Sequence, residues 1–362
     1  MERFWKTTLL LCLIYLACAM IINPIACTGA AKDALCLCLE VVIPALFPFF
    51  VCSRLFISLG AASLLSRWLS RLMRPLFGVP GSGALAVVLG VVSGYPVGAA
   101  CAADLYASGH CTKTEAGRLL AFCNNSGPLF VLGAVGIGML HSQYLGTVLY
   151  LSHVAAALMT GLLFSRLGRD VSVPALPPAP PSSPAVKNTA AAVGSAVGSA
   201  VDTVLKVCGF VILFAVFAAA LPSYPGSSFL YALLEITGGL RALLAVPLPA
   251  LLLLPLCSMF LSFSGVSVLM QTAGIVLPAG LSLRPYLLGK LTHGLLSFFL
   301  TFLLLFFFPA PEPAFALSAV PAAVPGPKEL LVFALISILW CAVAIGVLAL
   351  AAWLFDRFDK HK

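Results

Sequence analysis

Residues 122–130 read FCNNSGPLF and lie inside a long apolar run. Pro128 has no backbone N–H, so in a helix the carbonyl of Asn124 would lose its hydrogen-bond donor, and Gly127 relaxes the backbone further. Broken backbone at membrane depth persists only where protein, water or a ligand satisfies its polar groups. This stretch therefore predicts a discontinuous transmembrane helix with a functional break.

The composition of the whole chain is that of a polytopic membrane protein built from helices. Of its 362 residues, 61% are hydrophobic and 9% are charged, with a mean hydropathy of +1.10. A soluble domain carries about 25% charged residues, so this chain cannot build a water-facing surface. The net charge of +8 lies mainly in loops. It therefore indicates membrane orientation and offers no concentrated basic face for nucleic acid.

The apolar runs predict a series of membrane spans, since each is near or above the length needed to cross a bilayer. The expected spans are residues 7–22, 34–59, 115–140, 144–167, 194–221, 286–308 and 329–355. Two further runs, 83–106 and 249–278, are interrupted near their middles by SGYPVG and SFSGVS.

The chain divides into two similar halves. We expect an N-terminal transmembrane anchor (1–30), a first repeat (33–167), a proline-rich linker (168–192), a second repeat (193–355) and a charged tail (356–362). A cleaved signal peptide is the alternative for the anchor. At a constant offset Ser93 and Gly94 correspond to Ser264 and Gly265, and the order of elements repeats. Because such duplication is common in transporters, we expect an all-α fold of two inverted repeats. Each repeat is expected to contain an interfacial helix, a re-entrant hairpin and a broken transmembrane helix.

The interfacial segments help to set the expected topology. Residues 63–78 place Arg67, Arg71 and Arg74 at helical spacing beside apolar side chains, a pattern typical of a helix in the headgroup plane. Residues 231–245 are the counterpart in the second half. If run 83–106 enters the membrane and returns, the positive groups of the first half all stay cytoplasmic. The same reasoning applied to run 249–278 places the C-terminal tail outside.

The span 286–308 is expected to be the second-half counterpart of the broken span 115–140, and it carries a polar stripe. Its members, at helical spacing, are Lys290, His293, Gly294, Ser297 and Thr301. Ionisable residues inside a membrane are functional candidates. For Lys290 the alternative is an amine that reaches the headgroups. His293 would suit proton coupling, or else bonds a backbone carbonyl. Glu40, Asp104 and His153 are interpreted as structural, His153 as a hydrogen bonder between helices.

The sequence offers no sign of an enzyme or a metal site. None of the common hydrolase, metalloprotease or nucleotide-binding motifs is present. The 12 cysteines lie mostly in apolar runs without a C-x-x-C pair, as expected of small buried hydrophobes. We therefore expect no enzyme activity, no metal and no cofactor, and we leave open a coupling ion, H⁺ or Na⁺.

Several motifs resemble the YlbJ family of sporulation integral membrane proteins. They are GYPVGA, ADLY and FCNNSGP in the first half, and LEITGGL, FSGVSVLMQ and GKLTHG in the second. The resemblance covers residues 36–300. It implies the nucleoside recognition or gate domain, which is shared with concentrative nucleoside carriers, ferrous iron permeases and spore maturation proteins. It also implies a role in making the spore cortex, in a membrane of the sporangium.

In the nucleoside carriers the substrate lies between hairpin tips and broken helices. Carried over, the resemblance implies a substrate site at Ser93, Gly94, Tyr95, Asn124, Asn125, Ser126, Ser264, Gly265, Lys290 and His293. Those carriers bind base and ribose with glutamine and glutamate near the tips. Here the first tip has neither, and Gln271, near the second, completes the candidate set.

The leading hypothesis is thus a transporter-like core for a small polar solute, acting in spore formation. The alternatives are a membrane scaffold without transport and a channel. The expected partners are the lipid bilayer and the solute, with no nucleic acid. A homo-oligomer is compatible with the pattern.

Overall fold

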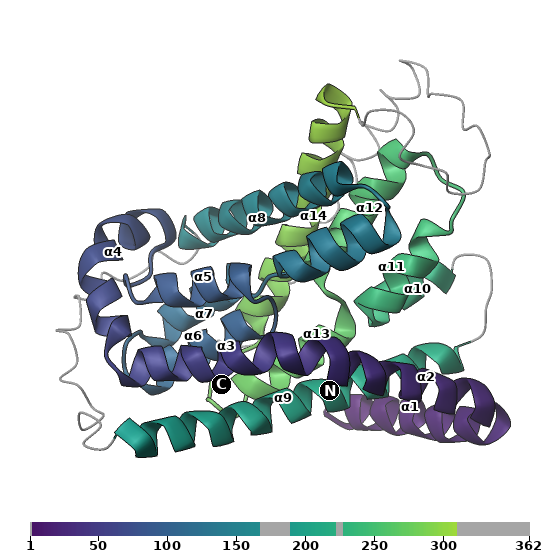
Figure 1. The fold of residues 1–362 in the computed structure, drawn as a ribbon, viewed down its shortest axis with the longest axis horizontal. Helices are drawn as coiled ribbons and strands as arrows, with labels where there is room; N and C mark the ends of the chain where they lie inside the picture. Colours follow the sequence, from purple (N-terminus) through teal and green to yellow (C-terminus); the bar gives the residue numbers. More distant parts are fainter. Residues whose placement is uncertain (1, 167–188, 222–226, 310–362) are drawn as a thin grey trace.

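The computed structural model describes residues 2–166, 189–221 and 227–309, and every regular element in these ranges is helical (Figure 1). The predicted span 329–355, the charged tail and residues 168–188 of the predicted linker lie outside the described residues. Residues 189–192, also assigned to the linker, are the first turn of a long helix.

The first part of the chain contains α1 (Glu2–Ile22), α2 (Pro24–Leu37), the π-helical turn η1 (Cys38–Val42), α3 (Ile43–Ser58), α4 (Ala61–Phe77), α5 (Gly83–Val92), α6 (Val97–Ala107), α7 (Lys113–Phe122), the π-helix η2 (Leu129–Met139) and α8 (Gln143–Arg166). The second part contains α9 (Thr189–Ala220), α10 (Ser227–Leu234), α11 (Ile236–Leu244), α12 (Ala250–Phe263), α13 (Gly265–Val276) and α14 (Arg284–Phe307).

Four helical segments of the described chain are long and apolar enough to cross a membrane. They are Gln143–Arg166, Ala190–Ala220, Ala250–Val276 and Arg284–Phe307, and a fifth span results if the pair Leu10–Ile22 and Pro24–Glu40, bent by 107°, is counted as one. The other apolar helices, among them α5, α6 and η2, are shorter. The protein is therefore an all-α, multi-pass membrane protein, as its composition predicts.

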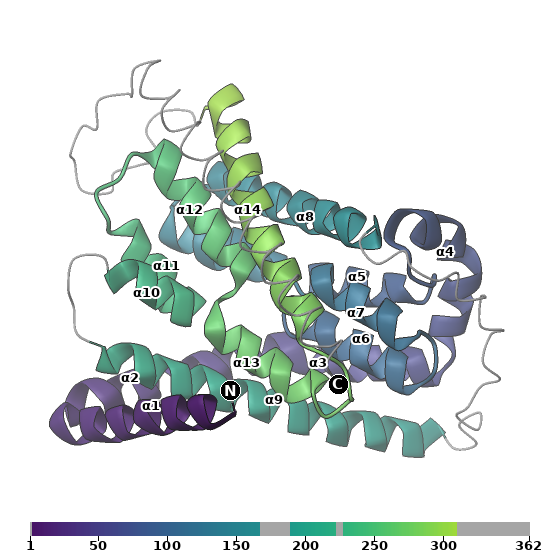
Figure 2. The same ribbon diagram turned by 180° about the vertical axis from the view of Figure 1, so that it is seen from behind.

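Helix α14 occupies the middle of the molecule. It packs against α7, α8 and α12, and in both views it runs between the α4–α7 group and the α10–α12 group (Figures 1 and 2). Helix α9 packs along α2, α3 and α13 and forms one long edge. Elements from both halves of the sequence thus meet around α14.

The first interrupted run folds back as a helical hairpin, in which α5 packs on α6. Between them Gly94 has a φ of 94°, a left-handed conformation that glycine adopts readily. The two arms also approach the end of α7 at glycines. A Cβ atom on Gly90 would lie 1.7 Å from the carbonyl oxygen of Cys123, and one on Gly98 would lie 2.0 Å from it.

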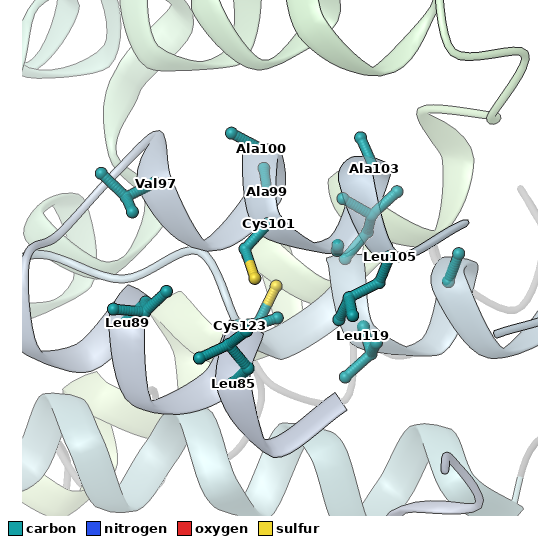
Figure 3. Packing of buried hydrophobic residues seen from close by; sticks show 14 of the residues in the cluster. Leu85, Leu89, Val97, Ala99, Ala100, Cys101, Ala103, Leu105, Leu119 and Cys123 are labelled. Atoms are coloured by element: carbon teal, nitrogen blue, oxygen red, sulfur yellow. The ribbon is translucent and has the colours of Figure 1, made fainter. Parts of the chain in front are cut away.

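Small and medium-sized apolar residues fill the space between this hairpin and α7. Leu85 and Leu89 of α5 lie opposite Val97 and Cys101 of α6, and the thiol of Cys123 points into the same cluster (Figure 3). The described cysteines are free thiols, and Cys101 and Cys123 are fully buried. These two act as small core hydrophobes.

The second interrupted run differs from its prediction. Helices α12 and α13 do not fold back as a hairpin but continue as one broken span, Ala250–Val276. Only Ser264 and Gly265 depart from helical geometry, with φ values of 76° and 77°. One residue between two helices is too short a connection for a chain reversal, which needs at least about two. The expectation of a second re-entrant hairpin is therefore wrong.

The broken helix of the second half is also placed differently. Helix α14 was expected to be the counterpart of the broken α7–η2 segment, yet it is continuous over Arg284–Phe307. Its proline, Pro285, lies in the first turn, where no helical donor is lost. Gly294 alone does not interrupt a helix. The break of the second half therefore lies between α12 and α13.

The two interfacial segments behave differently as well. Helix α4 is continuous, and its Arg67, Trp68, Arg71 and Leu72 are exposed while Met73 is buried, as an amphipathic helix requires. The segment 231–245, expected as one helix, is divided by Glu235 into α10 and α11. The Glu235 carboxylate accepts hydrogen bonds from the backbone N–H groups of Thr237 (2.8 Å) and Gly238 (2.7 Å), and so caps α11.

Replacement of Gly90 by alanine is expected to destabilise the fold, because the new Cβ would overlap the backbone of Cys123. Overpacking of this kind costs about 1–3 kcal/mol. The measurement is thermal unfolding of the purified protein in detergent. Gly209→Ala in α9 is the matched control, since nothing lies within 4 Å of its Cβ position. Equal melting temperatures for the two variants would contradict the close approach.

Candidate functional site

The predicted helix break is present and buried. Helix α7 begins with a capping box between Thr112 and Glu115 and ends at Phe122, and residues 124–127 are not helical. Asn124, Asn125 and Ser126 are each at most 2% exposed. The Asn125 side-chain N–H group donates to the carbonyl of Phe122 at 2.9 Å, which satisfies one free carbonyl at the end of α7.

Lys290 of α14 supplies the donor that Pro128 withholds. Its Nζ atom lies 2.7 Å from the carbonyl oxygen of Asn124. The side chain is 2% exposed, so it points into the protein and does not reach the headgroups. The neighbouring Gly289 permits this contact, because a Cβ there would lie 2.1 Å from the carbonyl oxygen of Ala121 in α7.

Two histidines continue the network from Lys290. The Nδ1 atom of His293 lies 3.5 Å from Lys290 Nζ, and its Nε2 atom lies 2.9 Å from the carbonyl oxygen of His153 in α8. A carbonyl can only accept, so Nε2 of His293 carries a hydrogen. In the neutral ring Nδ1 is then an acceptor that faces the lysine. The two imidazole rings are 4.5 Å apart between centroids.

His153 connects the breaks of the two halves. The backbone N–H of Ser126 donates to its Nε2 atom at 2.9 Å, so Nε2 carries no hydrogen and the ring is neutral. Its Nδ1–H group faces the Ser262 hydroxyl at 2.7 Å, two residues before the α12–α13 break at Ser264. The Ser126 hydroxyl also donates to the carbonyl of Leu261 at 3.3 Å. His153 is thus the hydrogen bonder between helices that was expected, and it lies at the centre of the site.

The two asparagine side chains are only partly satisfied. The Asn124 amide faces the hydroxyls of Thr272 (3.2 Å) and Tyr286 (3.4 Å) with one end, and its other end meets no partner among the described residues, whichever way the amide is turned. In the same part of the chain, the buried Oδ1 atom of Asn125 also has no partner. An unpaired buried polar atom costs about 1–3 kcal/mol. These two atoms are therefore candidate positions for a ligand.

The tip of the first hairpin touches the break. A Cβ on Gly127 would lie 2.9 Å from the carbonyl oxygen of Ser93, and one on Gly94 would lie 2.8 Å from the backbone nitrogen of Gly127. The Tyr95 phenol interacts with Ser126. The Ser93 hydroxyl donates to Leu89 within its own helix at 2.6 Å, so the contribution of Ser93 to the site is its backbone.

Three candidate residues of the second half are held mainly by their own segments. The Ser264 hydroxyl bonds the carbonyls of Leu261 and Ser262, and it meets the network only at the Leu261 carbonyl, which also accepts from the Ser126 hydroxyl. Gly265 packs against the backbone carbonyls of Leu233 and Leu234 at the end of α10. The Gln271 amide bonds Ser267 on its own helix at 3.3 Å. The structure thus brings together Asn124, Asn125, Ser126, Lys290 and His293 with the hairpin tip, and leaves these three at its border.

Three residues of this network were left out of the candidate site predicted from the sequence: Thr272, Tyr286 and His153, which was interpreted as structural. His153 carried the same signal as His293, an ionisable group in the middle of an apolar span. Thr272 and Tyr286 carried no such signal, because a threonine or a tyrosine in a helix is ordinary.

The lower part of the predicted polar stripe has a different role. Ser297 and Thr301 of α14 are fully buried and bond to Ser258 of α12, at 2.6 Å and 2.8 Å. These hydroxyls satisfy one another, so they tie α12 to α14 and leave no open position.

The charge at the site is unbalanced. Within the described ranges the ion pairs include Arg54 with Asp104 and Arg74 with Glu115, and no carboxylate pairs with Lys290. A buried amine that lacks a counter-charge is rare, and inside a membrane it is a candidate functional residue.

Comparisons with known proteins agree with the motifs. A family profile described as "Gate: Nucleoside recognition" matches residues 39–178. The sporulation integral membrane protein YlbJ of Bacillus subtilis (strain 168) is 31% identical to this chain over 318 aligned residues, which cover 78% of each chain. No solved structure matches the chain.

Replacement of Lys290 by methionine is expected to lower the free energy of unfolding by about 1–3 kcal/mol, because the Asn124 carbonyl then loses its donor in a buried place. Methionine preserves most of the length of the side chain. The measurement is thermal unfolding in detergent, with the exposed Lys113→Met at the start of α7 as the control. A Lys290→Met protein as stable as the control would show that the carbonyl has no need of the amine.

Proposed function

Since the chain belongs to the YlbJ family of sporulation integral membrane proteins, we propose that it acts in spore cortex formation as a transporter-like protein that binds and moves a small polar solute. The solute binds at the α7–η2 break, between the first hairpin and α14. The observation that carries this proposal is the pair of buried asparagine amides with unpartnered atoms beside an unpaired lysine.

The open positions limit the chemistry of the solute. Asn125 Oδ1 requires a hydrogen-bond donor, because its amide nitrogen already bonds Phe122. The free end of the Asn124 amide accepts or donates according to its orientation. The solute therefore presents at least one N–H or O–H group and a second polar group, as sugars, amides and nucleosides do.

The first hairpin supports a transporter-like reading. Helices α5 and α6 have 10 and 11 residues, so each is about 15 Å long at 1.5 Å per residue. That is about half of a 30 Å hydrocarbon core. We therefore place α5 and α6 as a re-entrant hairpin whose tip, at Ser93 and Gly94, reaches the midplane next to the break. Binding at a break near the midplane is the arrangement used by many secondary transporters.

The duplication has support in the backbone. Gly94 and Gly265 both have positive φ (94° and 77°), and so do Gly109 and Gly280 (73° and 75°), at the same offset. Helices α7 and α14 begin at the matching residues Lys113 and Arg284. These agreements favour two related halves that have diverged at their breaks. The orientation of each half in the membrane stays a prediction.

One observation favours the alternative of a scaffold without transport. Most polar groups at the break are already bonded within the protein, including Ser126, His153 and the Asn124 carbonyl. A protein that only holds other spore-membrane components needs such a sealed network and no open position.

A complementation experiment separates the two functions. Expression of this chain in a Bacillus subtilis strain without its YlbJ relative is expected to restore heat-resistant spores. The double variant Asn124→Ala and Asn125→Ala is expected to insert in the membrane and to fail in complementation, because it removes both open positions. Gln143→Ala, an exposed amide at the start of α8, is the control. Normal spores from the double variant would favour the scaffold.

Ligand screening tests binding directly. Purified protein is mixed with nucleosides, sugars and cell-wall precursors, and thermal unfolding is followed. A solute that binds the folded state raises the melting temperature of the wild-type protein. It should leave Asn125→Ala unchanged. Equal shifts in both proteins would place the solute elsewhere.

A further inference from the structure

The contact between Lys290 and the break points to the identity of the coupling ion. We propose that the coupling ion of this protein is a proton, bound to Lys290 and passed to His293, and that no Na⁺ binds at the break. This inference rests on the proposed function, because a proton can be a coupling ion only if the protein moves a solute. The proton site itself is a property of the folded protein and is tested without a solute.

The freed carbonyl at the helix break is the place that a cation would occupy. Where a helix is broken inside a membrane, the freed carbonyls commonly coordinate Na⁺. Here the carbonyl freed by Pro128 belongs to Asn124, and Lys290 Nζ already lies 2.7 Å from it. The amine therefore takes the position of the bound cation. A second positive charge beside the protonated amine is repelled.

His293 is the acceptor of the proton from Lys290. His293 Nδ1 lies 3.5 Å from Lys290 Nζ, on the same face of α14. Its Nε2–H is held by the carbonyl of His153 at 2.9 Å, so Nδ1 of the neutral ring has a free lone pair. When the proton moves, one N–H bond of the Lys290 ammonium breaks and an N–H bond forms on Nδ1. The products are a neutral amine and an imidazolium.

His153 is not a second carrier. Protonation of its Nε2 atom would break the hydrogen bond from the Ser126 backbone N–H. Its Nδ1 already faces Ser262. The fixed partners on both nitrogens keep this ring neutral, and its carbonyl orients His293. We therefore assign His153 as a positioning residue.

Among the described residues, no other group around Lys290 competes with His293 as the acceptor of the proton. Tyr286 lies on α14 itself, and Cys123 is a buried thiol at the end of α7. Helices α12 and α13 contribute the uncharged Ser262 and Thr272. Among the described residues around the amine, His293 is thus the base within reach.

Loss of the proton from Lys290 weakens the hydrogen bond that its amine makes at the helix break. The charged amine makes a charge-assisted bond to the Asn124 carbonyl, and such bonds are about twice as strong as neutral ones. A neutral amine holds the carbonyl less firmly and can turn its lone pair toward a donor of the solute. Proton release and solute binding at Asn124 are thereby linked.

The direct test is ¹⁵N nuclear magnetic resonance of lysine-labelled protein in detergent. The Lys290 signal is identified by its absence in Lys290→Met. We expect its chemical shift to change from the ammonium to the amine value across about pH 6 to 9, the interval around neutrality in which a coupling group must exchange its proton. A Lys290 signal that keeps the ammonium value throughout overturns the proposal.

A sodium arm accompanies this measurement. The melting temperature of the wild-type protein is compared in sodium chloride and in choline chloride of equal concentration. We expect no difference, because the cation position is filled. A melting temperature raised by Na⁺ in the wild type, and not in Asn124→Ala and Asn125→Ala, overturns the proposal.

Lys290→Arg separates proton release from a structural role. Arginine keeps the charge and the donor, yet it does not lose a proton in proteins. We expect a folded protein that fails to restore heat-resistant spores. Full complementation by Lys290→Arg would show that the charge alone suffices and would remove the proton from the mechanism. If this variant does not fold, the resonance experiment decides.

The failures of the two proposals are distinguishable. A titrating Lys290 together with normal spores from the Asn124 and Asn125 double variant contradicts the solute site only. A permanently charged Lys290 together with a defective double variant contradicts the proton only.

Discussion

The structure depends on one backbone carbonyl that has lost its helical hydrogen-bond donor. Pro128 removes the N–H group that would have bonded the carbonyl of Asn124, and in a membrane no water replaces it. The amine of Lys290, from the other half of the sequence, takes this place at 2.7 Å. The two halves are therefore joined by a hydrogen bond at the point where the first half is broken. Among the described residues the lysine has no carboxylate partner, and its partner is a backbone carbonyl.

Close backbone contacts at glycines make this bond geometrically feasible. Gly289 brings α14 against Ala121 of α7, and Gly90 and Gly98 bring the hairpin against Cys123. These contacts lie at Ala121 and Cys123, which come shortly before Asn124 in the chain. The position of the amine is thus set by packed backbone and not by a flexible loop. Such rigid support is what a binding site needs if its polar groups are to remain unpaired until a ligand arrives.

The sequence predicted the elements better than their connections. Pro128 and the neighbouring asparagines located the break, and the spacing of Lys290 and His293 located the buried face of α14, because both signals are local. The sequence could not distinguish the chain reversal at residues 93–96 from the continuous path of the chain at Ser264, since both runs contain serine and glycine between apolar stretches. The difference lies in the number of non-helical residues, which depends on packing. Thr272 and Tyr286 entered the site through tertiary contacts alone, and no local pattern could have marked them.

The glycine contacts also restrict how the molecule can move. Helix α14 cannot slide or turn against α7, nor can the hairpin shift on the end of α7, unless backbone atoms in van der Waals contact separate. These contacts favour movement of α5, α6, α7 and α14 as one rigid body. Under the proposed transport, a change of access between the two sides of the bilayer would then come from movement of this body against its other neighbours, which include α3, α4 and α13.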